Sequence, residues 1–208
     1  MKVERLNKRI ASVRNLNLIG EFVIELIVRL IDREINHAQN GRNARILAKL
    51  NNLVDPQIVD KLYEASQAGV VIKLIVRGMC SLNPGISGLS ENIRVTSIVD
   101  RFLEHTRLFI FDNKGDPDIF ISSADWMGRN LDQRVEVTVP IYDDEIKKRL
   151  IAIMEIQLAD NQKARIIDGS LKNSYVPRGN KRKIRSQEAI YRFLSSDKDK
   201  AQKSEKRK

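Results

Sequence analysis

Two apolar segments on either side of a helical pattern most strongly restrict how this chain can fold. Residues 44–50 and 70–76 are predicted strands, and the second is an almost unbroken β-branched and aliphatic run, typical of a strand covered on both faces. Between them, Asp55 and Pro56 begin a helix as its cap and first residue, and Gly69 ends it. A strand, a helix and a strand in succession form a βαβ unit, which implies two parallel strands with a right-handed crossover.

The remaining elements extend this unit into a larger layer. Further strands are predicted at 93–99, 107–111, 119–122 and 135–141. We expect Pro140 to stop the last of these strands, and amphipathic spacing predicts helices at 22–38 and 144–158. The predicted fold class is therefore α/β, with a mixed β-sheet flanked by helices.

The chain has an excess of basic residues that bears on its partners. Its 208 residues carry a formal net charge of +10, so a polyanion is the first partner to consider. Much of that excess lies in the last thirty or so residues, where a solvated tail would carry it without any partner. We expect three parts: a helical extension at 1–21, the α/β domain at 22–175, and a basic tail at 176–208. The tail should contain a short helix at 186–193 and a partly disordered, charged end.

The cysteine count and the hydropathy bear on the cellular compartment of the chain. Cys80 is the single cysteine, which excludes an internal disulfide framework and a cysteine-based zinc site and suits a reducing compartment. The most apolar segment, residues 22–31, is interrupted by Glu25 and Arg29, so we expect no transmembrane segment. Together these features predict a cytoplasmic protein.

A histidine and an arginine at alternate positions are the first candidate for chemistry. His105 and Arg107 fall in a strand-like segment, where residues two apart point to the same side of the sheet. An imidazole can attack phosphorus or protonate a leaving oxygen, while a guanidinium holds phosphate oxygens without titrating. The pair predicts phosphoryl chemistry.

Arg77 is a second cation in a favourable position. It follows the strand at 70–76, and ligands of open α/β sheets bind beyond the carboxyl ends of the strands. The position suits a phosphate, and it equally suits an ion pair with a nearby carboxylate. The two interpretations have equal weight from position alone.

Residues 105–112, HTRLFIFD, resemble the phospholipase D superfamily signature H-x-K-x-x-x-x-D. Arg107 takes the lysine position, and Asp112 takes that of the terminal aspartate. The resemblance implies a phospholipase D-like domain in which both residues support a phosphate site around the histidine.

Residues 122–136, SSADWMGRNLDQRVE, resemble the second element of that superfamily, G-S-x-N-x-x-x-R-x-x-x-x-N-x-E. Ser123 and Asp125 take the small and polar positions, and Glu136 takes that of the terminal acid. The resemblance adds Ser123, Arg129 and Glu136 to the supporting phosphate site.

A closer resemblance runs from about residue 30 to about residue 193. The segments KLNNLVDP, LYEASQAGVVIKLIVRGMC, SIVDRFLEHTR and SADWMGRNLDQRVEV resemble the C-terminal domain of polyphosphate kinase. That family transfers the terminal phosphate of ATP reversibly onto inorganic polyphosphate, through a phosphohistidine and with Mg²⁺. The resemblance implies that Arg77 and His105 contact the phosphates of the nucleotide, with His105 as the catalytic residue of this chain.

The same resemblance implies the partners. They are ATP, ADP, inorganic polyphosphate and the upstream domains of a longer enzyme, with a homo-oligomer allowed and nucleic acid not expected. The family's phosphorylated histidine and Mg²⁺ ligands belong to an upstream domain, so we expect no metal ligands in this chain and little activity from it alone.

Two alternatives stay open from the sequence. One is a homodimeric phosphodiesterase of the phospholipase D type, in which each copy provides one histidine; Arg107 in the lysine position counts against it. The other is a non-enzymatic module that binds polyanions through the basic tail.

Overall fold

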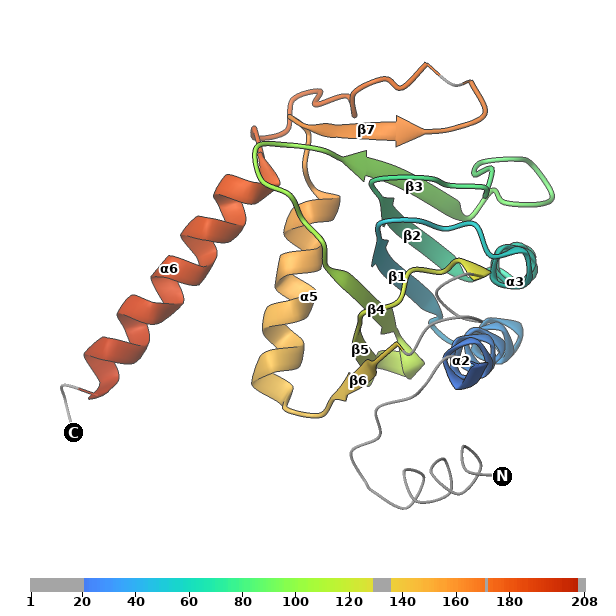
Figure 1. Ribbon diagram of the computed structural model, residues 1–208, viewed down its shortest axis with the longest axis horizontal. Coiled ribbons are helices and arrows are strands. Elements are labelled where there is room, and N and C mark those ends of the chain that lie inside the picture. Colours follow the sequence, from blue (N-terminus) through green and yellow to red (C-terminus); the bar gives the residue numbers. More distant parts are fainter. Residues whose placement is uncertain (1–20, 129–135, 171, 206–208) are drawn as a thin grey trace.

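A computed structural model of the chain contains one mixed sheet between two pairs of helices (Figure 1). It describes residues 21–128, 136–170 and 172–205, so nearly all of the expected N-terminal extension lies outside the described residues. The strands are β1 (Arg45–Leu50), β2 (Val71–Val76), β3 (Ile93–Ile98), β4 (Arg107–Phe111), β5 (Asp118–Ser122), β6 (Thr138–Ile141) and β7 (Ala164–Ile167). The helices are α2 (Glu21–Gln39), α3 (Pro56–Gln67), α5 (Asp144–Leu158) and α6 (Ser186–Glu205), with a short 3₁₀ turn, η1 (Asn113–Gly115).

The seven strands lie in the order β6-β5-β4-β1-β2-β3-β7. The adjacent strands β1, β2 and β3 are parallel to one another, and every other neighbouring pair is antiparallel. The predicted βαβ unit is confirmed, with the Asp55 carboxylate accepting a hydrogen bond from the N–H of Ile58 and with Gly69 in the left-handed region at φ 93°. The predicted mixed sheet flanked by helices is confirmed as well.

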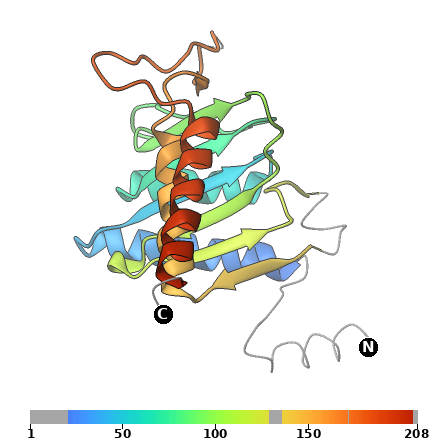
Figure 2. The same ribbon diagram turned by 90° about the vertical axis from the view of Figure 1, so that its left-hand side faces the viewer.

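Helices cover both faces of the sheet and create two cores (Figure 2). The helices α2 and α3 cover one face, where a core of 23 buried hydrophobic residues includes Ile31, Leu62 and Trp126. On the other face α5 covers a core of eight buried hydrophobic residues that includes Met154, and α6 packs against α5. Among the described residues, none of the helices is both long enough and apolar enough to cross a membrane.

The structure corrects three details of the predicted elements. The strand β7 was not predicted; it is four residues long and pairs with β3. Pro140 does not stop β6 but lies within it, opposite Phe120, which is possible because β6 is an edge strand. The predicted short helix at 186–193 is wrong in length, since α6 continues to Glu205 through the charged residues that were expected to be disordered.

Candidate functional site

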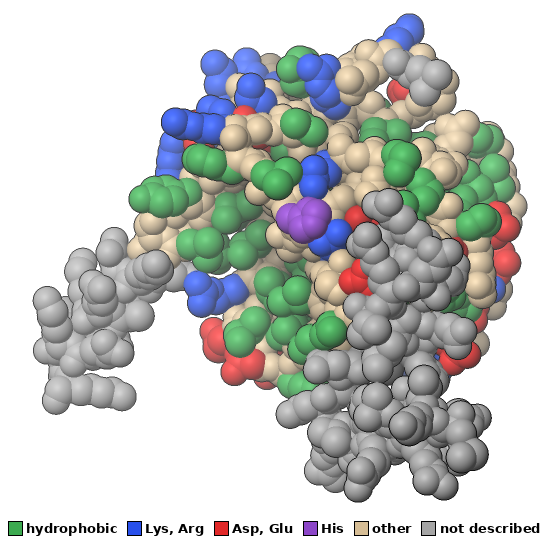
Figure 3. Space-filling model, viewed as in Figure 1, with side chains coloured by type: hydrophobic (Ala, Val, Ile, Leu, Met, Phe, Trp, Pro, Cys, Tyr) green, Lys and Arg blue, Asp and Glu red, His purple; other side chains and the backbone are tan. Residues whose placement is uncertain are grey.

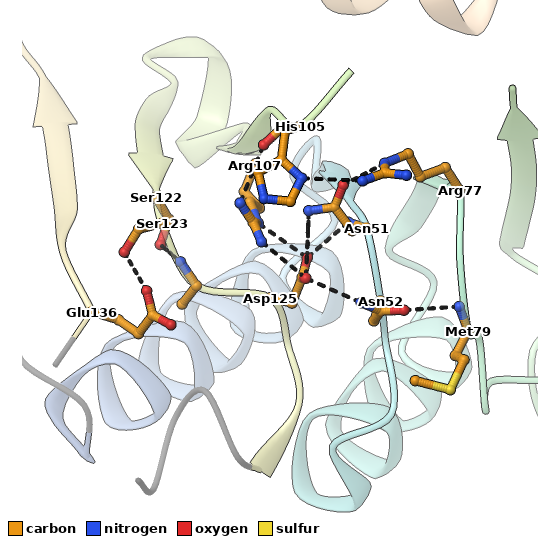
Figure 4. Close-up of polar contacts among 11 residues, drawn as sticks. Asn51, Asn52, Arg77, Met79, His105, Arg107, Ser122, Ser123, Asp125 and Glu136 are labelled. Atoms are coloured by element: carbon orange, nitrogen blue, oxygen red, sulfur yellow. Dashed lines mark hydrogen bonds and ion pairs between the residues drawn. The ribbon is translucent and has the colours of Figure 1, made fainter. Parts of the chain in front are cut away.

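Four chain segments meet at one edge of the sheet (Figure 4). The parallel strands β1 and β2 both end there, which places Asn51 and Arg77 side by side. The strand β4 is antiparallel to β1 and therefore starts at this edge with His105 and Arg107, and β5 returns to it just before Asp125. The topology thus brings together residues that are up to 74 positions apart in the sequence.

A buried carboxylate lies at the centre of this cluster. Asp125 is 3% exposed and accepts two hydrogen bonds from the Arg107 guanidinium, at 3.2 Å and 3.1 Å. It also accepts from the backbone N–H of Asn51 at 2.7 Å and from the side-chain amide of Asn52 at 3.2 Å. Burial by itself would raise the pKa of Asp125, but these hydrogen bonds outweigh that effect, and the pKa lies below its ordinary value. Arg107 and Asp125 therefore form a charge-compensated pair.

Arg77 connects this pair to the histidine. Its Nε donates to Asn51 Oδ1 at 2.5 Å, and its Nη2 lies 3.1 Å from His105 Nδ1 (Figure 4). A guanidinium has only donors, so His105 Nδ1 must accept this hydrogen bond, which leaves the ring proton on Nε2. The exposed imidazole can then donate from Nε2 to an anion beside the Arg77 guanidinium.

The loop that precedes β4, residues 99–106, carries the histidine and is fastened to the start of α6. We refer to it as the histidine loop. The Asp100 carboxylate accepts two hydrogen bonds from the Arg185 guanidinium, at 2.8 Å and 2.7 Å, and these lower the pKa of Asp100. The Gln187 side chain accepts from the backbone N–H of Phe102 at 3.0 Å and donates to its carbonyl at 2.8 Å. Both contacts restrict the position of the loop.

A third fastening joins the histidine loop to the sheet and to α5. Lys49, on β1, is 3% exposed, and its ammonium donates to Glu104 at 2.6 Å. Gln157, on α5, donates to the same carboxylate at 3.3 Å. Burial lowers the pKa of Lys49, while the hydrogen bond to Glu104 partly offsets this. Residues 100, 102 and 104 of the loop are thus each held by a different partner.

The structure brings together some of the predicted site residues. Arg77, His105 and Arg107 lie at one edge of the sheet, although His105 belongs to the loop before β4 and not to the strand itself. Arg107 is already engaged by Asp125, whereas Arg77 faces the histidine. Two interpretations of Arg77 were left open, a phosphate ligand and an ion pair with a carboxylate. Among the described residues Arg77 forms no ion pair with a carboxylate, which favours the first interpretation.

Other predicted site residues lie elsewhere. Asp112 follows β4 at its opposite end, where its carboxylate is 3.6 Å from the Arg45 guanidinium, so it is not brought to the histidine. The Ser123 hydroxyl donates a hydrogen bond to Glu136 beside the cluster (Figure 4). It also accepts a hydrogen bond from the N–H of Val137. Arg129 lies outside the described residues.

Sequence reasoning missed the asparagines that complete the cluster. Asn51 and Asn52 directly follow the strand β1, so the argument that singled out Arg77 at the end of β2 applies to them equally. Lys49 and Glu104 gave no comparable signal, since their pairing depends on the antiparallel arrangement of β1 and β4.

Comparisons with known proteins identify the family of this chain. The family model of the polyphosphate kinase C-terminal domain 2 matches residues 20–187. The chain belongs to this family. Polyphosphate kinase from Yersinia pestis is 57% identical over 171 residues, which are 82% of this chain and 25% of that protein. The relative from Vibrio vulnificus (strain YJ016) is also 57% identical, and the match covers 24% of its length. The chain therefore spans about a quarter of the length of these curated relatives.

Solved structures support the same family and the fold. The crystal structure of polyphosphate kinase from Porphyromonas gingivalis superposes with a TM-score of 0.86 at 45% identity, over 88% of this chain and 28% of that one. NucT from Helicobacter pylori superposes with a TM-score of 0.51 at 13% identity, over 70% of this chain and 95% of that one, which shows a shared fold alone. The expected membership in the polyphosphate kinase family is confirmed.

The polyphosphate kinase family implies Mg²⁺, and the residues of this site do not fit a magnesium ion. Within the described residues, no three histidine, cysteine, aspartate or glutamate side chains gather to hold a metal. The carboxylate in the cluster, Asp125, is buried and bound to Arg107. The side chains that remain for a ligand are the guanidinium of Arg77 and the imidazole of His105, which suit an anion.

Proposed function

We propose that this chain binds the phosphates of ATP between Arg77 and His105 and contributes to the reversible transfer of the terminal phosphate of ATP to inorganic polyphosphate. The observation that carries the proposal is the 3.1 Å contact between Arg77 Nη2 and His105 Nδ1 at an exposed edge of the sheet. The polyphosphate kinase relatives supply the reaction, and the geometry supports a role in holding phosphate.

Each residue of the cluster has a distinct part in this proposal. The Arg77 guanidinium provides the positive charge that phosphoryl oxygens need, and Asn51 orients it through its Nε. His105 donates from Nε2 to a phosphate oxygen. In this tautomer Nε2 carries the ring proton, so His105 serves as a hydrogen-bond donor to the phosphate, while the family resemblance assigns the phosphorylated histidine to an upstream domain. Arg107 and Asp125, which compensate each other's charge, position the start of β4 and the end of β5.

The proposal treats the chain as one half of a site. Phosphohistidine formation and Mg²⁺ binding would come from upstream domains, as would the second histidine that phospholipase D-like chemistry requires. We infer that the chain alone binds ATP, ADP and polyphosphate weakly and turns over little, with its partner domains or a second copy completing the site. The α/β domain at 22–175 and a cytoplasmic location, consistent with the free thiol of Cys80, belong to the same proposal.

Calorimetric titration of ATP into three forms of the chain tests the proposal. We expect Arg77→Ala to weaken ATP binding about tenfold to a hundredfold, the range for losing a hydrogen bond to a charged group. Arg42→Ala is the matched control, because Arg42 is exposed and precedes β1 at the opposite edge of the sheet, and it should leave the affinity unchanged.

Three results would contradict the proposal. Robust ATP-dependent polyphosphate synthesis by this chain alone would show that it is not half of a site. Hydrolysis of a generic phosphodiester that is abolished by His105→Ala would favour the homodimeric phosphodiesterase. Salt-sensitive polyanion binding that survives both Arg77→Ala and His105→Ala, with no ATP binding, would favour the non-enzymatic module.

A further inference from the structure

A basic groove lies between α5 and α6, apart from the Arg77–His105 cluster. Its volume is about 920 Å³, within the range of about 300–1,000 Å³ that is usual for ligand sites. Five of its twelve lining residues are basic, two are acidic and none is aromatic. The basic residues are Lys163, Arg182, Lys183, Arg185 and Arg192. Figure 3 shows Lys and Arg side chains gathered at the upper left of the face on which a histidine is visible.

The acidic residues of the groove do not neutralise its free cations. Glu188 accepts from Arg185 at 2.9 Å and lies 3.4 Å from Arg192, while Glu155 accepts from Arg45 outside the groove. Arg182 and Lys183 are exposed, and their side chains make no ion pair within the part of the chain that the structure describes. The groove therefore presents positive charge to the solvent.

Hydrogen bonds from a buried asparagine fix the wall that carries Arg182 and Lys183. Asn161, which is 8% exposed, donates from its side chain to the Arg182 carbonyl at 2.8 Å. Its side-chain oxygen accepts from the N–H of Ile184 at 3.0 Å, and its own N–H donates to the Ile184 carbonyl at 3.0 Å. The basic segment is thus held against the end of α5, and its charges project from an ordered backbone.

A second buried residue joins the two helices that form the groove. Asp160, which is 1% exposed, accepts from the N–H of Lys163 at 2.7 Å and from the N–H of Ser186, the first residue of α6, at 2.7 Å. Burial alone would raise the pKa of Asp160, but these hydrogen bonds outweigh it and lower the pKa. The groove is therefore a preformed feature, and the ordering of its walls does not depend on a ligand.

The groove adjoins the histidine loop. Arg185 lines the groove, and its guanidinium holds Asp100 of that loop through two hydrogen bonds. An anion that occupies the groove is therefore bound beside the segment that positions His105. A linear chain of phosphates is the ligand that makes use of several separate cations along such a groove.

We propose that the basic groove is a second anion site, which binds a run of linked phosphates of an inorganic polyphosphate chain. The choice of polyphosphate rests on the function proposed above, and the site itself rests on the groove residues. Single-stranded nucleic acid is less suited, because proteins bind it by stacking bases on aromatic side chains, and none lines this groove.

Titration of long-chain sodium polyphosphate into the full chain tests the groove. The variant Arg182→Gln/Lys183→Gln should weaken binding about tenfold or more, and the slope of log affinity against log salt should fall by about one for each cation removed. Its affinity for ATP should not change. The control variant Arg29→Gln/Arg42→Gln removes the same charge from exposed positions on or near α2, on the other face of the sheet, and should bind polyphosphate as the unmodified chain does.

Each other outcome has a definite meaning. Equal weakening in both double variants would show that net charge alone attracts polyphosphate, and would overturn the groove. If the groove variant binds polyphosphate as tightly as the unmodified chain, the groove proposal is also overturned, whatever effect Arg77→Ala has on ATP binding. If Arg77→Ala leaves ATP binding unchanged while the groove variant still binds polyphosphate more weakly, the proposed function is removed and the groove site remains. Tighter, groove-dependent binding of polyuridylate than of polyphosphate would replace the proposed ligand by RNA.

Discussion

The α2/α3 face of the sheet and the α5/α6 face are attached to the strands by different kinds of contact. On the first face a large core buries apolar side chains such as Ile31 and Leu62. On the second the apolar core is about a third of that size, and buried polar residues such as Gln157, Asp160 and Asn161 join the helices to loops. Apolar burial stabilises without fixing directions, whereas hydrogen bonds hold particular groups in particular places. The first face therefore supplies stability, and the second positions the histidine loop and the groove.

The largest expected effect comes from removing equivalent apolar side chains on the two faces. Leu62→Ala, in the fully buried part of α3, should lower the free energy of unfolding by about 2–5 kcal/mol. Leu150→Ala, on the half-buried side of α5, should lower it by less than half as much. Urea unfolding midpoints measure both. Equal losses would show that the two faces stabilise the fold alike.

A smaller loss of stability is expected when the buried carboxylate of Asp125 is removed from its pair with Arg107. Asp125 has a lowered pKa, so its contribution to stability is present above its ordinary value of 3.8 and is lost as the pH falls through the lower folded value. We expect Asp125→Asn to cost about 1–3 kcal/mol at neutral pH, since Arg107 loses its partner. The difference from the unmodified chain should shrink as the pH falls below 3.8.

Urea unfolding as a function of pH checks this expectation. Asp60→Asn is the control, because Asp60 is an exposed residue of α3 and should not alter the acid dependence. A constant difference between the Asp125→Asn variant and the unmodified chain at every pH would mean that the carboxylate charge is not what the cluster requires.

The smallest effect separates positioning from stability. Gln187→Ala removes both hydrogen bonds to Phe102 and should weaken ATP binding about threefold to tenfold while changing the unfolding midpoint little. Gln67→Ala removes a similar contact, to the Gly88 carbonyl at 2.9 Å, on the α3 side. The second variant should bind ATP normally. Identical affinities in the two variants would show that the fastening to α6 does not position the histidine.

The same contrast explains what the sequence could predict. The βαβ unit was predictable because its signals are local: an aliphatic run, an Asp-Pro start and a glycine end. Arg77 was found because it immediately follows a strand. The strand β7 was missed because four residues, ARII, carry too short a pattern, and its pairing with β3 is decided by tertiary structure.

The pairing within the site was also beyond sequence reasoning. Arg107 and Asp125 are 18 positions apart, and nothing local indicates that they neutralise each other. Asp112 fits the signature as well as His105 does, yet a five-residue strand places the two at opposite edges of the sheet. A motif gives the order of residues, and strand direction decides which of them meet.

The assembly of the site from four separate strand ends couples ligand occupancy to global folding. Asn51, Arg77, His105 and Asp125 converge only when β1, β2, β4 and β5 are paired, so the unfolded chain offers an anion no comparable site. A ligand present at about one hundred times its dissociation constant then adds about 2.7 kcal/mol to the free energy of unfolding. For the phosphate site proposed above, a rise in the melting temperature on adding ATP would therefore report binding, even where no catalytic turnover can be observed.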